Sequence, residues 1–367
     1  MKSITSKALL PVAAIAFTLA GVSTASAQQE ESRWDFSGDF RLRAEFNDNA
    51  PGTVDRHRQR MRFRFGGTFQ VNDEIVVGAR MITGNSDDPN SPHVDFGDVL
   101  NSFELSLDRL YVMYTPEEAP GLALIGGKFG HPMYRNPVYG ELVWDADVQP
   151  EGFAAAYSCN DCSVVDSFGI QAATVAVLEQ SGSEEAWAHW IGANFSNSTG
   201  EDSRLEGALS YTFFGDLTPG GSGAVAADLR GNSLTGSEAT SDYGIVDAIL
   251  AFHSGNFVVS GEFINNIRAH DSVGDTGVAV GAAVKTDVGK FYYQYATIEQ
   301  DAILTAISQD DLLMATNFDN HMVGWKKSLT ERTSLHVWVM ASEPNELLAG
   351  MVDEMIYRFR IDLNIDL

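Results

Sequence analysis

The segment from Trp34 to Val71 alternates between apolar and polar residues, and its polar positions are rich in arginine. Strict alternation is typical of a β-strand, because successive side chains of a strand point to opposite faces. A polar loop at positions 47–52 divides the segment into the two strands of a hairpin. One face of this hairpin is rich in phenylalanine. The other face carries six arginines: Arg41, Arg43, Arg58, Arg60, Arg62 and Arg64.

Neither a dry core nor a lipid surface accommodates these arginines. An unpaired charge in a dry core is very costly, and an arginine that faces lipid near the membrane midplane costs roughly 2–4 kcal/mol. A wall with lipid on its apolar face and water on its arginine face avoids both costs. The alternative is a solvent-exposed sheet of a soluble protein, and the phenylalanine face argues against it.

Residues 1–27 have the features of a secretory signal peptide. Lys2 and Lys7 form a positive n-region, Ala8 to Ala20 is an apolar core, and Ala25-Ser26-Ala27 fits a cleavage site. We therefore expect a mature domain over residues 28–367. No later stretch reaches the ~20 consecutive apolar residues that a membrane helix needs. The formal net charge of −26 argues against binding to nucleic acid.

The alternating pattern recurs to the end of the chain and predicts about 16 strands. Short turns, such as 72–73, 255–256 and 288–289, alternate with long loops at 84–101, 130–151, 215–242 and 300–318. This alternation is typical of an all-β, antiparallel transmembrane barrel with short periplasmic turns and long extracellular loops. An even number of strands places both termini in the periplasm. Residues 302–314 are expected to form a short helix inside the last of these loops.

The last expected strand resembles the first ones. Tyr357, Phe359 and Ile361 share one face, and Arg358 and Arg360 lie on the other. A closed barrel requires the first and last strands to pair, because an open edge in lipid would leave backbone groups unsatisfied. Arg358 and Arg360 would then extend the arginine face, and all eight arginines are expected to line the pore.

Several motifs make the chain similar to the putative porin family of Gram-negative outer membranes. They cover about the first half of the mature chain and are RMRFRFG at 60–66, GARMITGNSDDPN at 78–90, LDRLYVMYTP at 107–116, GGK at 126–128 and LVWDADVQPEG at 142–152. The chain departs from many such barrels in ending with Leu367 rather than phenylalanine. The resemblance implies a channel whose third long loop, 130–151, folds inward and narrows the pore. The carboxylates of this constriction loop are Glu141, Asp145, Asp147 and Glu151.

Other clusters favour simpler interpretations. Asn85, Asp87, Asp88 and Asn90 could offer oxygen ligands to Ca²⁺, but the full calcium-loop spacing is absent and a solvated turn is favoured. Cys159 and Cys162 flank a tight turn in an exported chain, which favours a small disulfide.

The eight histidines lack the spacings of known hydrolase motifs. We therefore expect no enzyme activity, no catalytic residue, no metal site and no cofactor.

The sequence thus predicts a porin of the cell outer membrane for passive diffusion of ions and small hydrophilic solutes. Its arginine wall would face the acidic loop. Two alternatives stay open. One is a channel selective for a sugar or an anion, with Tyr111, Tyr134 and Tyr139 as stacking surfaces. The other is a plugged barrel that acts as an adhesin or structural protein. The expected partners are outer-membrane lipid and the solutes, and a homotrimer is one compatible assembly.

Overall fold

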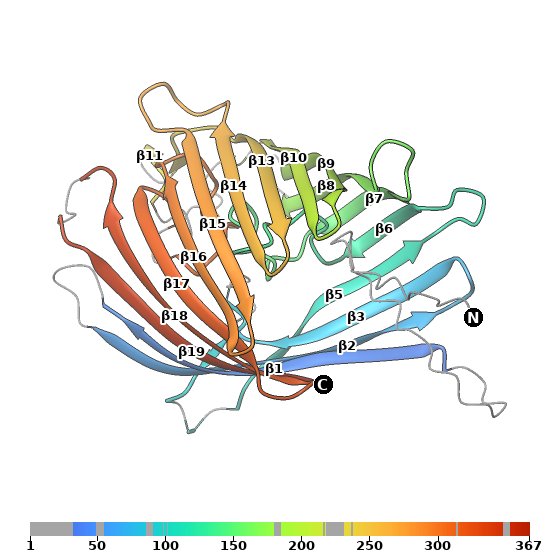
Figure 1. The fold of residues 1–367 in the computed structure, drawn as a ribbon, viewed down its shortest axis with the longest axis horizontal. Coiled ribbons are helices and arrows are strands. Elements are labelled where there is room, and N and C mark those ends of the chain that lie inside the picture. Colours follow the sequence, from blue (N-terminus) through green and yellow to red (C-terminus); the bar gives the residue numbers. More distant parts are fainter. Residues whose placement is uncertain are drawn as a thin grey trace.

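The chain forms a closed antiparallel β-barrel, shown as a ribbon in Figure 1. This is a computed structural model, and it describes residues 32–48, 55–85, 91–97, 99–100, 102–179, 185–215, 217, 231–235, 238–312, 315–347 and 353–367. The expected signal peptide, residues 1–27, lies outside the described residues. Within the described part of the chain, no helix is long and apolar enough to cross a membrane.

Sixteen long strands build the wall of the barrel. They are β1 (Trp34–Asn47), β2 (Arg56–Gln70), β3 (Ile75–Thr83), β5 (Leu105–Tyr114), β6 (Leu122–Lys128), β7 (Glu151–Asn160), β8 (Ser167–Leu178), β9 (Ala186–Gly200), β10 (Ser203–Gly215), β13 (Gly244–Ser254), β14 (Phe257–Asn266), β15 (Thr276–Thr286), β16 (Gly289–Ile298), β17 (Phe318–Ser328), β18 (Thr333–Pro344) and β19 (Ile356–Asp366). The short strand β4 (Val94–Asp95) adds to β2, and β11 (Leu234–Thr235) pairs with β12 (Glu238–Ala239) in a separate ribbon.

The barrel closes through strand β1, which pairs with β2 on one side and with β19 on the other. Figure 1 shows these three strands side by side, although β19 ends the chain. Closure leaves the wall without an open edge, as a sheet in lipid requires. The expected all-β barrel of 16 antiparallel strands is confirmed.

Loop lengths alternate around the barrel as the sequence pattern predicted. Two residues separate β9 from β10, β13 from β14, and β15 from β16, whereas the connections on the other side of these strands are longer. The chain ends beside a short connection, because the backbone N–H of Asp366 donates to the carbonyl of Arg332 in the β17–β18 turn (2.8 Å). Leu367 in turn donates to Gly38 near the start of β1 (3.0 Å). Both ends of the wall therefore lie on the short-turn side.

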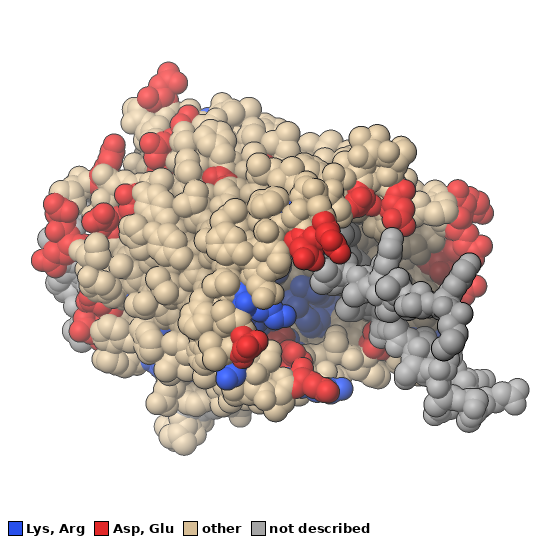
Figure 2. Space-filling view, viewed as in Figure 1, with Lys and Arg blue, Asp and Glu red and all other residues tan. Residues whose placement is uncertain are grey.

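The two faces of the wall differ in polarity. On β13–β16, outward side chains such as Leu250, Phe263 and Val280 are about half exposed, and inward side chains such as Glu262 and Gln294 are buried. In Figure 2 this outward face is almost free of Lys, Arg, Asp and Glu, and carboxylates gather toward the ends of the strands. An apolar outer surface around a polar interior is typical of a barrel that spans a lipid membrane.

Candidate functional site

Strands β1, β2 and β19 bring together the eight arginines that were expected to line the interior. This arginine cluster consists of Arg41, Arg43, Arg58, Arg60, Arg62, Arg64, Arg358 and Arg360. Its members are less exposed to solvent than arginines on the open wall of a water-filled channel would be. Arg43 and Arg62 are each 5% exposed, and Arg360 is 1% exposed. The cluster is covered by other parts of the chain.

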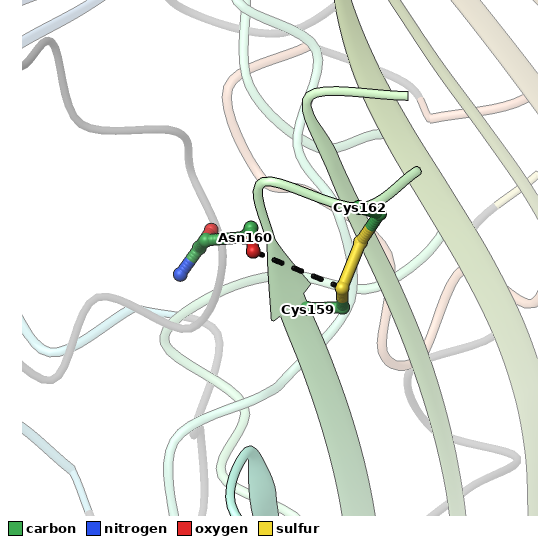
Figure 3. The surroundings of a disulfide bond; sticks show 3 residues. All are labelled: Cys159, Asn160 and Cys162. Atoms are coloured by element: carbon green, nitrogen blue, oxygen red, sulfur yellow. Dashed lines mark hydrogen bonds between the residues drawn. A yellow bond between two sulfur atoms is a disulfide. The ribbon is translucent and has the colours of Figure 1, made fainter. Parts of the chain in front are cut away.

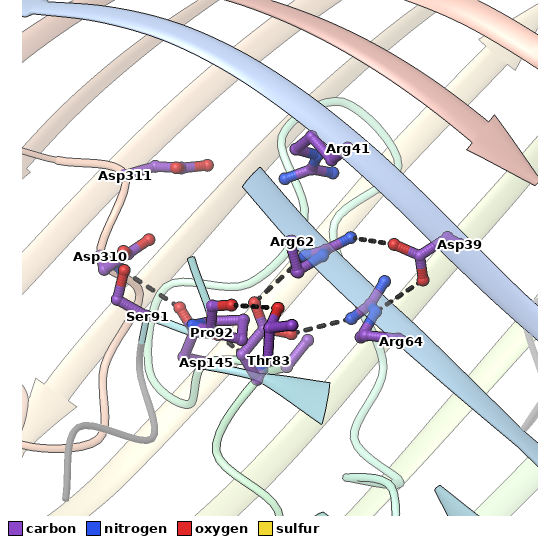
Figure 4. A network of polar contacts seen from close by, with 12 residues as sticks. Asp39, Arg41, Arg62, Arg64, Thr83, Ser91, Pro92, Asp145, Asp310 and Asp311 are labelled. Carbon is purple, nitrogen blue, oxygen red and sulfur yellow. Dashed lines mark hydrogen bonds and ion pairs between the residues drawn. The ribbon is translucent and has the colours of Figure 1, made fainter. Parts of the chain in front are cut away.

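Carboxylates on the same strands and on β4 neutralise most of the arginine cluster. Glu45, whose side chain is completely enclosed, forms ion pairs with both Arg58 and Arg360. Asp39 binds Arg62 at 2.8 Å and Arg64 at 2.6 Å, as Figure 4 shows. Two further pairs are Arg43 with Asp362 (2.7 Å) and Arg60 with Asp95 (2.6 Å). Since a buried charge is tolerated only with close partners, these pairs explain how so many arginines can be covered.

One of the covering segments is the loop between β6 and β7, residues 129–150, here called the first inner loop. Its side chains Phe129, Leu142 and Trp144 are 0%, 2% and 4% exposed and belong to a hydrophobic cluster with inward residues of the wall. The ring of Trp144 lies 5.5 Å from that of Trp190 on β9 and 6.1 Å from that of Phe214 on β10. This contact fixes the first inner loop against the inner face of the wall.

The four acidic residues assigned to this loop have different partners. Asp147 reaches the arginine cluster, at 2.9 Å from Arg64 and 3.4 Å from Arg62. Glu141 instead lies 3.5 Å from Arg135. Glu151 begins strand β7 rather than ending the loop, and it is exposed near Lys128 (3.6 Å). Asp145 accepts hydrogen bonds from backbone N–H groups. Among these four, only Asp147 has an ion pair with the cluster in the described structure.

The loop between β16 and β17, residues 299–317, also lies against the inner face and is here called the second inner loop. Ala302, Ile303 and Leu304 are completely buried. The expected helix over 302–314 is wrong for the described residues up to 312, which form turns and bends. The reason is that the backbone finds partners elsewhere. The side chain of Asn232 donates to the carbonyl of Ile303 (2.8 Å) and accepts from the N–H of Thr305 (2.9 Å).

Hydrogen bonds join the two inner loops to each other. The N–H of Asp145 donates to the carbonyl of Ile307 (2.8 Å), and the N–H of Asp310 donates to the carboxylate of Asp145 (3.1 Å). The second inner loop also binds the arginine cluster. Arg358 donates to the carbonyls of Asp310 and Asp311 (2.9 and 2.8 Å), and Arg360 forms an ion pair with the Asp311 carboxylate. The two loops and the cluster therefore form one connected unit.

Asp145 is the titratable group at the contact between the loops. Burial raises its pKa well above the usual range, and the nearby carboxylates of Asp310 and Asp147 raise it further. Asp311 behaves in the opposite way. Although burial acts to raise its pKa, the guanidinium groups of Arg360, Arg43 and Arg358 lower it to about 2. Ionisation therefore weakens the loop contact at Asp145 and strengthens it at Asp311.

Replacing Asp145 with asparagine should remove the loss of stability that the raised pKa of Asp145 causes as pH rises. A carboxyl group with a raised folded-state pKa contributes its full stability below its unfolded pKa of about 3.9, and this contribution is lost as pH rises through the folded value. Each unit of the shift corresponds to about 1.4 kcal/mol. Urea unfolding of D145N between about pH 3 and 8 should give a flatter profile. The control D311N should instead lose stability above about pH 4. A D145N variant whose stability falls as steeply with rising pH as that of the parent would contradict this assignment.

The sequence did not indicate that the second inner loop packs inside the barrel or that His93 is buried. The apolar run at 302–307 does not alternate, which could have indicated a segment that packs inside rather than an exposed loop. His93 precedes β4 and is 8% exposed. Burial lowers its pKa well below the usual range, and nearby members of the arginine cluster lower it further. No pattern in the sequence indicated this placement.

The three tyrosines considered as stacking surfaces do not form one surface. Tyr134 donates to Glu206 on β10 (2.9 Å), and Tyr139 donates to Glu262 on β14 (2.9 Å). Tyr111 is a partly buried residue of β5. The first inner loop therefore uses two of its tyrosine hydroxyl groups to attach to carboxylates of the wall.

The described residues contain no group of three or more His, Cys, Asp and Glu side chains that could hold a metal ion. Of the four residues considered for Ca²⁺, Asp87, Asp88 and Asn90 lie outside the described residues, and only Asn85 lies within them.

Cys159 lies near the end of β7 and Cys162 lies in the short connection to β8, and their sulfur atoms are bonded to each other (Figure 3). This end of β7 lies on the side of the barrel that carries the short turns. The connection lies at the opposite end of β7 from the first inner loop, so the bond joins residues of a single short turn.

Removing this bond should leave the conductance expected of a pore-forming barrel unchanged. The loop that it closes is short, so the loss of stability in a variant with both Cys159→Ser and Cys162→Ser should be below about 2 kcal/mol. Conductance and urea unfolding of the double variant test both points. Abolished conductance in a variant that still folds would mean that the cysteines have more than a structural role.

Comparisons with known proteins point to one class. Residues 45–177 match the model of a family described as putative porin. No curated protein sequence matches the chain. Among solved structures, Pseudomonas putida OprB is similar with a TM-score of 0.60 at 13% identity, over 91% of this chain and 94% of that chain. Salmonella typhi OmpF in complex with daunomycin is similar with a TM-score of 0.56 at 11% identity, over 91% of this chain and 97% of that chain. A mutant of the Rhodopseudomonas blastica porin is similar with a TM-score of 0.54 at 12% identity, over 91% of this chain and 100% of that chain. At these identities the structural matches establish a shared fold.

Proposed function

We propose that this chain, which matches the putative porin family over residues 45–177 and has the fold of solved porins, is an outer-membrane channel for passive diffusion of ions and small hydrophilic solutes. The observation that carries this proposal is the polarity of the closed wall. Apolar side chains cover its outward face, and charged and amide side chains lie on its inward face. Barrels of 16–18 strands leave space for an aqueous lumen.

The arginine cluster and the inner loops form the proposed constriction. Asp147 connects the first inner loop to Arg62 and Arg64, and Asp311 connects the second inner loop to Arg360. Solutes would pass beside this unit rather than along bare arginines, because most guanidinium groups are already paired. Selectivity would then come from the width that the loops leave and from the charges still unpaired there.

The outer membrane is the proposed location, with lipid as the partner of the outward face. Both ends of the wall lie on the short-turn side, which is periplasmic in this class of barrel. A homotrimer is one proposed assembly. Nothing in this mechanism requires a cofactor or a catalytic residue.

Liposome swelling tests this function directly. Purified, folded protein should make vesicles permeable to small neutral sugars and progressively less permeable to larger ones. Heat-modifiable electrophoretic mobility shows beforehand that the barrel is folded. Vesicles that contain folded protein and stay impermeable to every solute would overturn the proposal.

A plugged barrel with a structural or adhesive role is the second candidate. The observation in its favour is that both inner loops pack tightly against the wall, with Phe129, Ile303 and Leu304 all 0% exposed. The same vesicles discriminate the two functions, because a plugged barrel would remain impermeable even to the smallest sugar.

A further inference from the structure

A cavity of about 260 Å³ lies between the two inner loops and strands β16–β18. Its lining includes Lys290, Lys326, Gln309, Tyr292 and Trp338. Pockets for drug-sized ligands usually measure about 300–1,000 Å³, so this cavity suits a smaller solute. It borders the ion pairs described above, because Asp311 and Glu141 also line it, but none of the eight members of the arginine cluster does.

Two lysines lie side by side on the wall of this cavity without a carboxylate partner. Lys290 on β16 and Lys326 on β17 occupy directly opposite positions in the strand register. The ammonium group of Lys290 donates to the carbonyl of Pro137 (3.2 Å), and neither lysine has an ion pair within the described structure. Like charges at opposite positions of neighbouring strands destabilise a sheet. A bound anion would relieve this repulsion.

The carboxylates that also line the cavity are already engaged. Asp311 is paired with Arg360, and Glu141 lies 3.5 Å from Arg135. Asp145 accepts hydrogen bonds from the N–H groups of Asp147 (2.6 Å) and Asp310 (3.1 Å), and burial raises its pKa. The charge that remains available to a ligand is therefore that of the two lysines.

Gln309 supplies a further donor that has no acceptor. Its side chain is 7% exposed, and its amide nitrogen has no hydrogen-bond partner, whereas its amide oxygen accepts from the N–H of Leu312 (3.0 Å). Buried polar groups are almost always satisfied. The nitrogen is shielded from the cavity in the present conformation, so the amide would rotate toward the cavity for the oxygen of an anionic ligand to accept from it.

Aromatic rings form the remaining surface of the cavity. Tyr139 comes from the first inner loop, Tyr292 from β16 and Trp338 from β18. The hydroxyl group of Tyr292 is hydrogen-bonded to His336 (2.9 Å), and the indole of Trp338 packs under Arg360 with 4.9 Å from the guanidinium carbon to the ring centroid. These contacts fix two of the rings in place, and they offer a flat apolar body a surface to contact.

We propose that this cavity binds a small organic anion that combines a carboxylate with a planar apolar body. The carboxylate would lie between Lys290 and Lys326 with an oxygen on the Gln309 amide, and the apolar body would contact the aromatic rings. The inference rests on the proposed channel function, in which such an anion is a preferred solute.

Calorimetric titration of the folded, detergent-solubilised protein with benzoate tests the site. We expect saturable binding that weakens at least about tenfold in the double variant Lys290→Gln and Lys326→Gln, because charged hydrogen-bond partners are lost. Lys327→Gln is the matched control, since Lys327 is the next residue of β17 and does not line the cavity. Benzamide, which has the same body without the charge, should bind much more weakly. If the double variant does not fold, Lys326→Gln alone replaces it, because Lys326 is exposed.

Three results would overturn the inference: no saturable binding of benzoate, equal binding of benzamide, or an equal loss of affinity in Lys327→Gln. The failure of this inference can be told from the failure of the channel proposal. Vesicles permeable to sugars together with absent benzoate binding would refute the site alone. Benzoate binding to a protein that leaves vesicles impermeable would refute the channel alone.

Discussion

Replacing Glu45 with glutamine should lower the free energy of unfolding by about 3–5 kcal/mol, the largest effect that we expect from a single change. The Glu45 side chain is completely enclosed and neutralises both Arg58 and Arg360, and the Arg360 side chain is only 1% exposed. Glutamine keeps the shape but removes the charge, which leaves two largely buried guanidinium groups short of a partner. Urea unfolding in phospholipid vesicles measures the loss.

Glu151→Gln is the matched control for this variant. Glu151 is also a carboxylate at the end of a wall strand, but its side chain is 67% exposed and lies 3.6 Å from Lys128. An exposed ion pair of this kind contributes about 0–1 kcal/mol. A double variant with Glu45→Gln and Arg360→Gln should lose less than the sum of the two single losses, because the two side chains interact. Equal losses for Glu45→Gln and Glu151→Gln would contradict the enclosed network.

Replacing Phe63 with arginine should impair insertion into the membrane by roughly 2–4 kcal/mol if position 63 lies near the midplane. Phe63 is in the middle of β2, opposite Phe40 of β1, on the face away from the arginine cluster. The folded fraction in vesicles, measured by heat-modifiable mobility across a urea series, reports the cost.

Phe63→Leu is the control for the lipid-facing position, because leucine keeps an apolar side chain there. It should insert almost as well as the parent protein. A Phe63→Arg variant that inserted like Phe63→Leu would show that Phe63 does not face lipid, and the assignment of the two faces would be reversed.

The barrel could be predicted from the sequence because its signals are local. Period-two alternation places side chains such as Arg62 and Phe63 on opposite faces. The alternation of loop lengths places the short turns on one side of the barrel and the long loops on the other. The short turn expected at 255–256 agrees with the two residues that separate β13 from β14. These features depend on neighbouring residues alone, and the pairing of β1 with β19 follows from the need to close the wall.

The interior could not be predicted in the same way, since it depends on contacts between distant segments. The second inner loop carries an apolar run that fits a helix locally, but Asn232 takes its backbone hydrogen bonds. The arginines were expected on a water-filled wall, whereas the structure covers most of them with ion pairs and loops. Asp310 and Asp311 lie about 50 residues from Arg358 and Arg360, and no sequence pattern connects them.

Single-channel recording in a planar lipid bilayer tests the central claim most directly. Ion pairs and hydrogen bonds hold the inner loops against the wall of the folded barrel. The account therefore predicts steady, discrete conductance steps rather than brief, irregular ones. Heat-modifiable mobility of the same sample establishes that the protein is folded. Discrete steps from folded protein are the result that the account predicts, and a folded protein that inserts without any conductance would contradict it.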